Sequence, residues 1–75
     1  MSLVKGIRDS FKAKGLEYVS IQESPNDRDK TLLTYKDGSG KTLTKEIAIR
    51  MDNLKEALSE VSIIDPDGLA DYLLG

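Results

Sequence analysis

The chain has 75 residues, with 11 lysine and arginine residues against 13 aspartate and glutamate residues, which gives a formal net charge of −2. It contains no cysteine and no histidine, so a disulfide framework and the usual zinc sites are excluded, because these need thiol or imidazole groups. A chain of this length forms one small domain, residues 1–75, which buries only about 60% of the surface that the unfolded chain exposes.

The first element that the sequence predicts is an amphipathic helix over residues 3–14. Val4, Ile7 and Phe11 recur at helical spacing, and basic residues occupy the opposite side. Ser2 is expected to cap the start of this helix. Gly15 is expected to end it, because glycine adopts the left-handed backbone conformation that often follows a helix.

Three strands are predicted next. Residues 16–23 and 31–36 contain β-branched and aromatic side chains, and the charged, proline-containing stretch 24–30 between them is typical of an exposed loop. Residues 37–40, Asp-Gly-Ser-Gly, are a strong turn signal, so residues 31–36 and 41–50 are expected to pair as a β-hairpin.

The stretch after this turn has two interpretations. Apolar residues from position 43 to position 61 also fit one stripe of a helix, so a single long helix over residues 42–61 is an alternative to a strand over residues 41–50. We prefer the strand, because Ile47 and Ile49 share one face of a strand but lie about 200° apart around a helix.

Two helices are predicted to close the chain. The first covers residues 53–61, with Asp52-Asn53 as its N-cap and Glu56 completing a capping box. The second covers residues 66–74, because Asp65-Pro66 is typical of a helix start. The buried side predicted for this last helix consists of Leu69, Tyr72 and Leu73.

The fold class predicted is therefore α+β, in the order α-β-β-β-α-α, with a three-stranded antiparallel meander sheet packed against helices on one face. Double-stranded RNA-binding domains share the order α-β-β-β-α and bind duplex RNA through a basic, glycine-rich stretch that leads into their last helix. Here the second helix begins Asn-Leu-Lys-Glu without a lysine cluster. The order of elements alone identifies no family.

Two phosphate-related motifs are incomplete. Residues 38–42, Gly-Ser-Gly-Lys-Thr, look like the end of a Walker A loop, but that motif requires glycine at position 35, where Tyr35 stands. Residues 27–31 match the D-x-D-x-T string of aspartate-nucleophile phosphotransferases, but they fall in the exposed loop rather than at the end of a buried strand. Both stretches are expected to be solvated turns.

A calcium loop is also incomplete near the C-terminus. Asp65 and Asp67 are spaced like its first two ligands, but the sixth position is Ala70 instead of glycine, and the chain ends before a glutamate at the twelfth. With no histidine as a base near neutral pH, we expect no enzyme activity, no cofactor, no metal and no small-molecule substrate. With no stretch of about 20 apolar residues and no apolar leader, we expect a cytoplasmic protein without membrane association.

By elimination, the sequence favours a small non-enzymatic interaction module, protein-binding or regulatory, whose partner is another protein or a second copy of the chain. Strict alternation in the sheet would turn Val19 toward the helices and Tyr18, Leu32 and Ala48 outward. The candidate protein contacts are Tyr18, Leu32, Thr34, Thr44, Asp27, Arg28 and Tyr72.

Charge is divided unevenly along the chain. Residues 1–14 carry four basic residues and one acidic residue, a net of +3, whereas residues 52–75 carry one basic residue and six acidic ones, a net of −5. Either the two ends lie together, which we favour, or each presents its charge to a partner. The alternative functions are nucleic-acid binding through the first helix and inhibition of an enzyme. The candidate nucleic-acid contacts are Lys5, Arg8, Lys12 and Lys14.

Overall fold

The computed structural model describes residues 3–75, so the capping role predicted for Ser2 lies outside the described residues. Its order of elements confirms the predicted α+β fold. In chain order they are α1 (Leu3–Ala13), β1 (Glu17–Glu23), β2 (Thr31–Lys36), β3 (Thr42–Ile47), α2 (Met51–Ile64), the short 3-10 helix η1 (Pro66–Gly68) and α3 (Leu69–Leu74).

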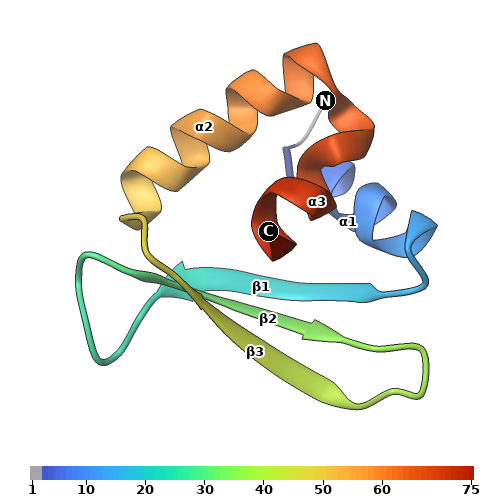
Figure 1. Ribbon diagram of the computed structural model, residues 1–75, viewed down its shortest axis with the longest axis horizontal. Coiled ribbons are helices and arrows are strands. Elements are labelled where there is room, and N and C mark those ends of the chain that lie inside the picture. Colours follow the sequence, from blue (N-terminus) through green and yellow to red (C-terminus); the bar gives the residue numbers. More distant parts are fainter. Residues whose placement is uncertain (1–2) are drawn as a thin grey trace.

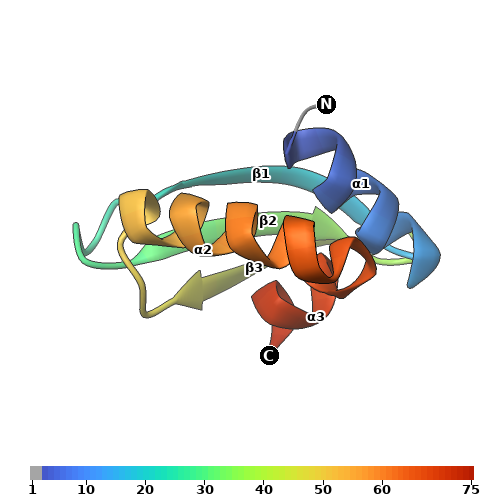
Figure 2. The same cartoon turned by 90° about the horizontal axis from the view of Figure 1, so that it is seen from above.

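The three strands form the predicted antiparallel meander, in the order β1-β2-β3. Strand β3 ends three residues earlier than predicted and pairs with β2 along its whole length, which rules out one long helix over residues 42–61. All helices lie on one face of the sheet (Figure 1). Seen from above, α1 lies on the β1 side, α3 on the β3 side, and α2 lies over the middle of the sheet, roughly along the strands (Figure 2).

The hairpin between β2 and β3 confirms the turn predicted at residues 37–40. One carboxylate oxygen of Asp37 accepts hydrogen bonds from the Ser39 backbone N–H at 2.9 Å, the Ser39 hydroxyl at 2.6 Å and the Lys41 backbone N–H at 3.0 Å. The bond from the Ser39 hydroxyl is the main reason that the pKa of this carboxyl lies below its usual range. Gly40 completes the turn with a φ of 87°, which a side chain would disfavour.

The orientation predicted for the start of β1 is wrong. The pairing register shifts between Tyr18 and Ser20, which is a β-bulge. Tyr18 therefore packs on the core, with its ring edge-on to Phe11 at a centroid distance of 5.9 Å, while Val19 stays 41% exposed. A bulge inserts one extra residue, so the strict alternation that the prediction assumed breaks at this point.

The core lies between the sheet and the helices. Phe11 is fully buried at its centre, and Tyr35 of β2 packs beside it at a centroid distance of 5.9 Å. Ile7 is buried as predicted, but Val4, one turn earlier on α1, is 43% exposed. The buried apolar residues are Ile7, Phe11, Leu33, Leu54, Leu58, Leu69, Ala70 and Leu73.

Small residues on α1 allow the C-terminal elements to approach closely. The buried hydroxyl of Ser10 accepts a hydrogen bond from the Ala70 backbone N–H at 2.9 Å and donates one to the Asp67 carbonyl at 2.9 Å. Ala70 lies in the first turn of α3, where a backbone N–H has no partner within its own helix. One turn earlier on α1, Gly6 leaves room for Leu69, because a Cβ there would lie 3.2 Å from the Leu69 side chain.

Two predictions about α2 are wrong. The helix begins at Met51, two residues early, and its N-cap is Arg50, which has extended backbone and makes no side-chain cap bond. Asp52 therefore lies in the first turn of α2 and is not the N-cap. Its negative charge interacts favourably with the positive end of the helix dipole. The helix also continues to Ile64, three residues beyond the predicted end.

The last helix starts later than predicted and turns a different set of residues toward the core. The stretch begins with η1, for which Asp65 stands at the N-cap position without a side-chain hydrogen bond, and α3 starts only at Leu69. Because Ser10 holds the Ala70 backbone, the buried side of α3 consists of Leu69, Ala70 and Leu73, and Tyr72 is 42% exposed.

We predict that Ser10→Ala lowers the free energy of unfolding by about 1–3 kcal/mol, because it leaves the buried Ala70 N–H without an acceptor. Chemical denaturation monitored by circular dichroism measures this change. Ser59→Ala is the matched control, since the exposed Ser59 hydroxyl donates only to the Lys55 carbonyl of its own helix. Equal, small effects of both substitutions would contradict the role given to Ser10.

Candidate interaction surface

The open face of the sheet carries three of the predicted contacts. Thr34 and Thr44 are direct cross-strand partners, and Leu32 stands opposite Glu46 on the same side. This side faces away from the helices (Figure 1), and the loop over residues 24–30 contacts it at Glu46. Apart from Leu32 the side chains named are polar or charged, which is typical of a solvated sheet face.

Both edges of the sheet are protected against pairing with a further strand. On β3, Lys45 stands opposite the fully buried Leu33, and its ammonium group donates a hydrogen bond to the Leu74 carbonyl at the end of α3. A charged residue that points inward on an edge strand and a β-bulge are both devices that discourage edge-to-edge pairing. The bulge at Tyr18 plays the second role on β1.

The loop over residues 24–30 is held by its own polar groups. Asp27 accepts a hydrogen bond from the Asp29 backbone N–H at 2.9 Å, which closes a turn. Glu46 of β3 accepts a hydrogen bond from the buried Ser24 hydroxyl at 3.0 Å and forms an ion pair with Lys30 at 3.2 Å. Arg28, the other predicted contact in this loop, is exposed.

The predicted protein contacts therefore do not form one surface. Leu32, Thr34 and Thr44 lie on the open face, whereas Tyr72 belongs to α3 on the opposite side of the sheet. Tyr18 is turned into the core by the bulge. An interaction site has to be sought in residues that the sequence pattern did not single out.

The end of α2 carries the most exposed large apolar residues that the structure describes. Ile63 and Ile64 are each 84% exposed, about twice the fraction of Val4, Val19 or Tyr72. Ile63 follows Leu54 by nine residues, so it lies about 180° around the helix from the side that packs on the core.

Carboxylates surround these two isoleucines. Glu60 lies one turn before them, Glu56 one turn earlier on the same outer side, and Asp65 follows Ile64 directly. All three are exposed, and among residues 3–75 none of them forms an ion pair. We call Glu56, Glu60, Ile63, Ile64 and Asp65 the α2 tip.

Sequence reasoning missed the α2 tip, although a signal was present. The stripe of Leu54, Leu58 and Val61 has no place for two adjacent β-branched apolar residues at positions 63 and 64. Because the predicted helix ended at residue 61, these isoleucines fell in the connection between two predicted helices. The apolar pattern gave no expectation of their burial there.

The predicted basic side of α1 is present. Lys5, Arg8 and Lys12 are exposed, share one side of the helix with Val4, and form no ion pair among residues 3–75. We call Val4, Lys5, Arg8 and Lys12 the α1 basic face. The fourth predicted contact, Lys14, instead forms an ion pair with Asp71 of α3. The two ends of the chain lie together, as favoured, because α1 packs against η1 and α3, and among residues 3–75 Lys14–Asp71 is the one ion pair that joins them.

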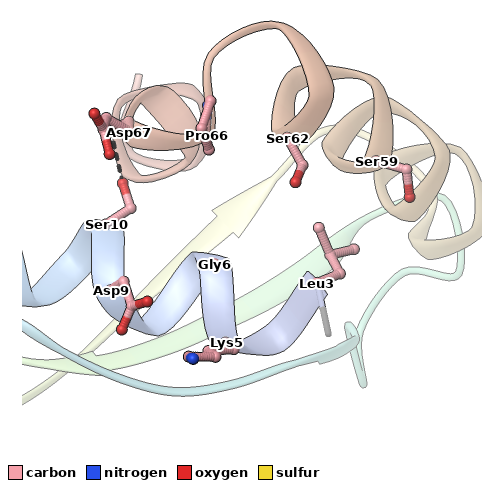
Figure 3. A pocket seen from close by; sticks show the side chains of 9 residues that line it. All are labelled: Leu3, Lys5, Gly6, Asp9, Ser10, Ser59, Ser62, Pro66 and Asp67. Carbon is pink, nitrogen blue, oxygen red and sulfur yellow. Dashed lines mark hydrogen bonds between the residues drawn. The ribbon is translucent and has the colours of Figure 1, made fainter. Parts of the chain in front are cut away.

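A cleft of about 330 Å³ separates α1 from the second half of α2. Leu3 points across it toward Ser59 and Ser62, and Pro66 lines its upper wall (Figure 3). Its one buried hydroxyl, that of Ser10, is already engaged in two hydrogen bonds. The cleft therefore separates α1 from the last turns of α2, which carry the α2 tip.

Within residues 3–75, no three histidine, cysteine, aspartate or glutamate side chains come together as metal ligands would. No helix in the same range is long and apolar enough to cross a membrane. Comparison of the chain with known protein families, curated proteins and solved structures gives no match. We therefore infer the function from the surfaces of the molecule.

Tyr18 gives an optical probe of the packing under α1. Burial raises the pKa of its phenol above the ordinary value of 10.0, and a backbone hydrogen bond from Ile21 and the positive charge of Arg8 oppose this effect. Since the folded chain holds the phenol proton more tightly than the unfolded chain, Tyr18 contributes stability below pH 10 that is lost as the pH rises through its folded pKa.

We predict that absorbance at the phenolate wavelength shows an ionisation step displaced above the ordinary phenol pKa of 10.0, and that Tyr18→Phe removes this step. The same substitution should make the free energy of unfolding fall less steeply above pH 10, because the group that favours the unfolded state there is gone. A late ionisation step that persists in Tyr18→Phe would show that Tyr18 is not the buried phenol.

Proposed function

We propose that the chain is a non-enzymatic protein-interaction module and that its contact surface is the α2 tip. The observation that carries the proposal is the pair of adjacent isoleucines, each 84% exposed, at the end of a helix whose opposite side is fully packed. Burying an isoleucine side chain contributes about 1.5–3 kcal/mol, so covering this pair would stabilise a complex by about 3–6 kcal/mol.

The carboxylates of the α2 tip indicate the charge of the partner. Glu56, Glu60 and Asp65 surround the isoleucines as a polar rim surrounds the apolar centre of an interface. A partner with an apolar centre and a cationic rim would match them, because opposite charges raise the association rate and exclude acidic competitors. The proposed partner is therefore a basic, amphipathic protein surface.

Nucleic-acid binding is less well supported. The α1 basic face offers three cations, which predicts a salt slope of only about −2.7 for duplex DNA and correspondingly weak binding. Single-stranded ligands need several exposed aromatic rings to stack on, but Phe11, Tyr18 and Tyr35 pack together in the core, which leaves Tyr72 of α3 as the one exposed ring among residues 3–75.

The proposal is tested with a photo-crosslinking amino acid in place of Ile63, in cells that naturally make the chain. We expect a protein adduct of defined mass that disappears when Ile64→Ser is added, because the neighbouring isoleucine completes the apolar centre. The matched control carries the crosslinker at Leu32 on the open face of the sheet and should give no such adduct. Adducts from position 32 alone would overturn the proposed surface, and nuclease-sensitive adducts from Lys12 alone would favour nucleic acid.

A further inference from the structure

We infer that the partner covering the α2 tip is a second copy of this chain, which docks its α1 basic face there. This inference rests on the proposed function and names the occupant of the same site. It follows from two surfaces of one molecule that match each other in charge and in apolar content.

The α1 basic face has the composition that the α2 tip requires. Val4 is 43% exposed, although it is a β-branched apolar residue on an otherwise amphipathic helix. Arg8 lies one turn beyond it, with Lys5 and Lys12 on the same side. Val4 thus borders a strip of three cations and Asp9 on α1, and in a second copy this strip would face the isoleucines and carboxylates of the α2 tip.

The charges of the two surfaces are not used within one molecule. Residues 1–14 carry a net charge of +3 and residues 52–75 a net charge of −5. Among residues 3–75, the one ion pair that joins these two stretches is Lys14 with Asp71, and neither residue belongs to the α2 tip or the α1 basic face. Complementary charge therefore remains for a contact between copies.

The two surfaces point in different directions. Arg8 and Lys12 line a hollow with Glu17 and Tyr18, at the β1 side of the molecule. The end of α2 instead rises away from the sheet (Figures 1 and 2). Lys5 of the α1 basic face borders the cleft between α1 and α2 together with Ser59 and Ser62. Because the contact joins two unlike surfaces, a single contact links copies head to tail, and two reciprocal contacts close a two-fold dimer.

The protection of the sheet edges does not hinder association of copies through α1 and α2. Lys45 on β3 and the bulge at Tyr18 on β1 discourage copies from joining by strand pairing. Association through α1 and α2 leaves both edges as they are. It also predicts a closed dimer where two copies exchange both contacts, and longer species where each contact joins a different copy.

The experiment is sedimentation velocity on the whole chain, over about 1 μM to 1 mM, the range in which weak complexes dissociate. We expect the average mass of the wild type to rise with concentration to that of a dimer or a longer species. We also expect it to fall at about 1 M salt, where charges are screened beyond about 3 Å. The tip variant Ile63→Ser/Ile64→Ser and the face variant Arg8→Ser/Lys12→Ser should each weaken association at least about tenfold.

Mixing the two variants gives the sharpest test. The tip variant keeps its α1 basic face and the face variant keeps its α2 tip, so an equimolar mixture should form a one-to-one dimer that cannot grow further. The matched control, Val19→Ser/Lys41→Ser, removes one exposed apolar residue and one exposed cation elsewhere and should associate like the wild type. Circular dichroism confirms that all variants are folded.

A wild-type chain that stays monomeric throughout, or a mixture of variants that gives no dimer, would overturn the inference. Crosslinking at position 63 keeps this failure distinct from failure of the proposed function. A monomeric chain that forms an adduct with a different protein there would refute the second copy as partner and leave the interaction module standing. A monomeric chain with no adduct at position 63 would refute both.

Discussion

The hydroxyl of Ser10 ties the last helix of the chain to the first. It accepts a hydrogen bond from the buried Ala70 N–H and donates one to the partly buried Asp67 carbonyl. Both are backbone groups of the turn from α2 into α3, and the Ala70 N–H would otherwise be buried without a partner. Gly6, one turn away, gives Leu69 the space to pack. Together these contacts decide where α3 begins and which of its residues enter the core.

The exposed end of α2 follows from that attachment. Leu54 and Leu58 pack α2 onto the core, while the chain must return to α1 within the few residues of η1. The last turn of α2 therefore extends past the core before the chain turns at Asp65, whose backbone N–H donates to the Val61 carbonyl. Ile63 is exposed because it lies on the side of α2 away from the core, and Ile64 because it follows Val61, the last residue of α2 that packs against the core.

Several elements could be predicted because their signals are local. The turn at residues 37–40 depends on glycine and on one aspartate side chain, and the two strands that it joins follow in register from it. The apolar periodicity of Ile7 with Phe11 and of Leu54 with Leu58 also survives in the core. For these segments, local preference and tertiary packing agree.

Other features depend on contacts between distant parts of the chain. The bulge that turns Tyr18 inward places its ring against Phe11, and no pattern within β1 indicates the extra residue. The start of α3 depends on Ser10, 60 residues away from Ala70. The α2 tip was missed for a different reason, because the predicted helix ended at residue 61, although the stripe of Leu54, Leu58 and Val61 excludes Ile63.

The central claim is that the α2 tip is a folded, uncovered surface that a second copy covers. The most direct measurement is a dilution series of the ¹⁵N-labelled chain followed by amide chemical shifts. We expect the amide signals of Ile63, Ile64, Val4 and Arg8 to shift together with concentration while those of Leu32 and Thr34 stay unchanged. Concentration-dependent shifts confined to the open face of the sheet, or none at any residue, would contradict it.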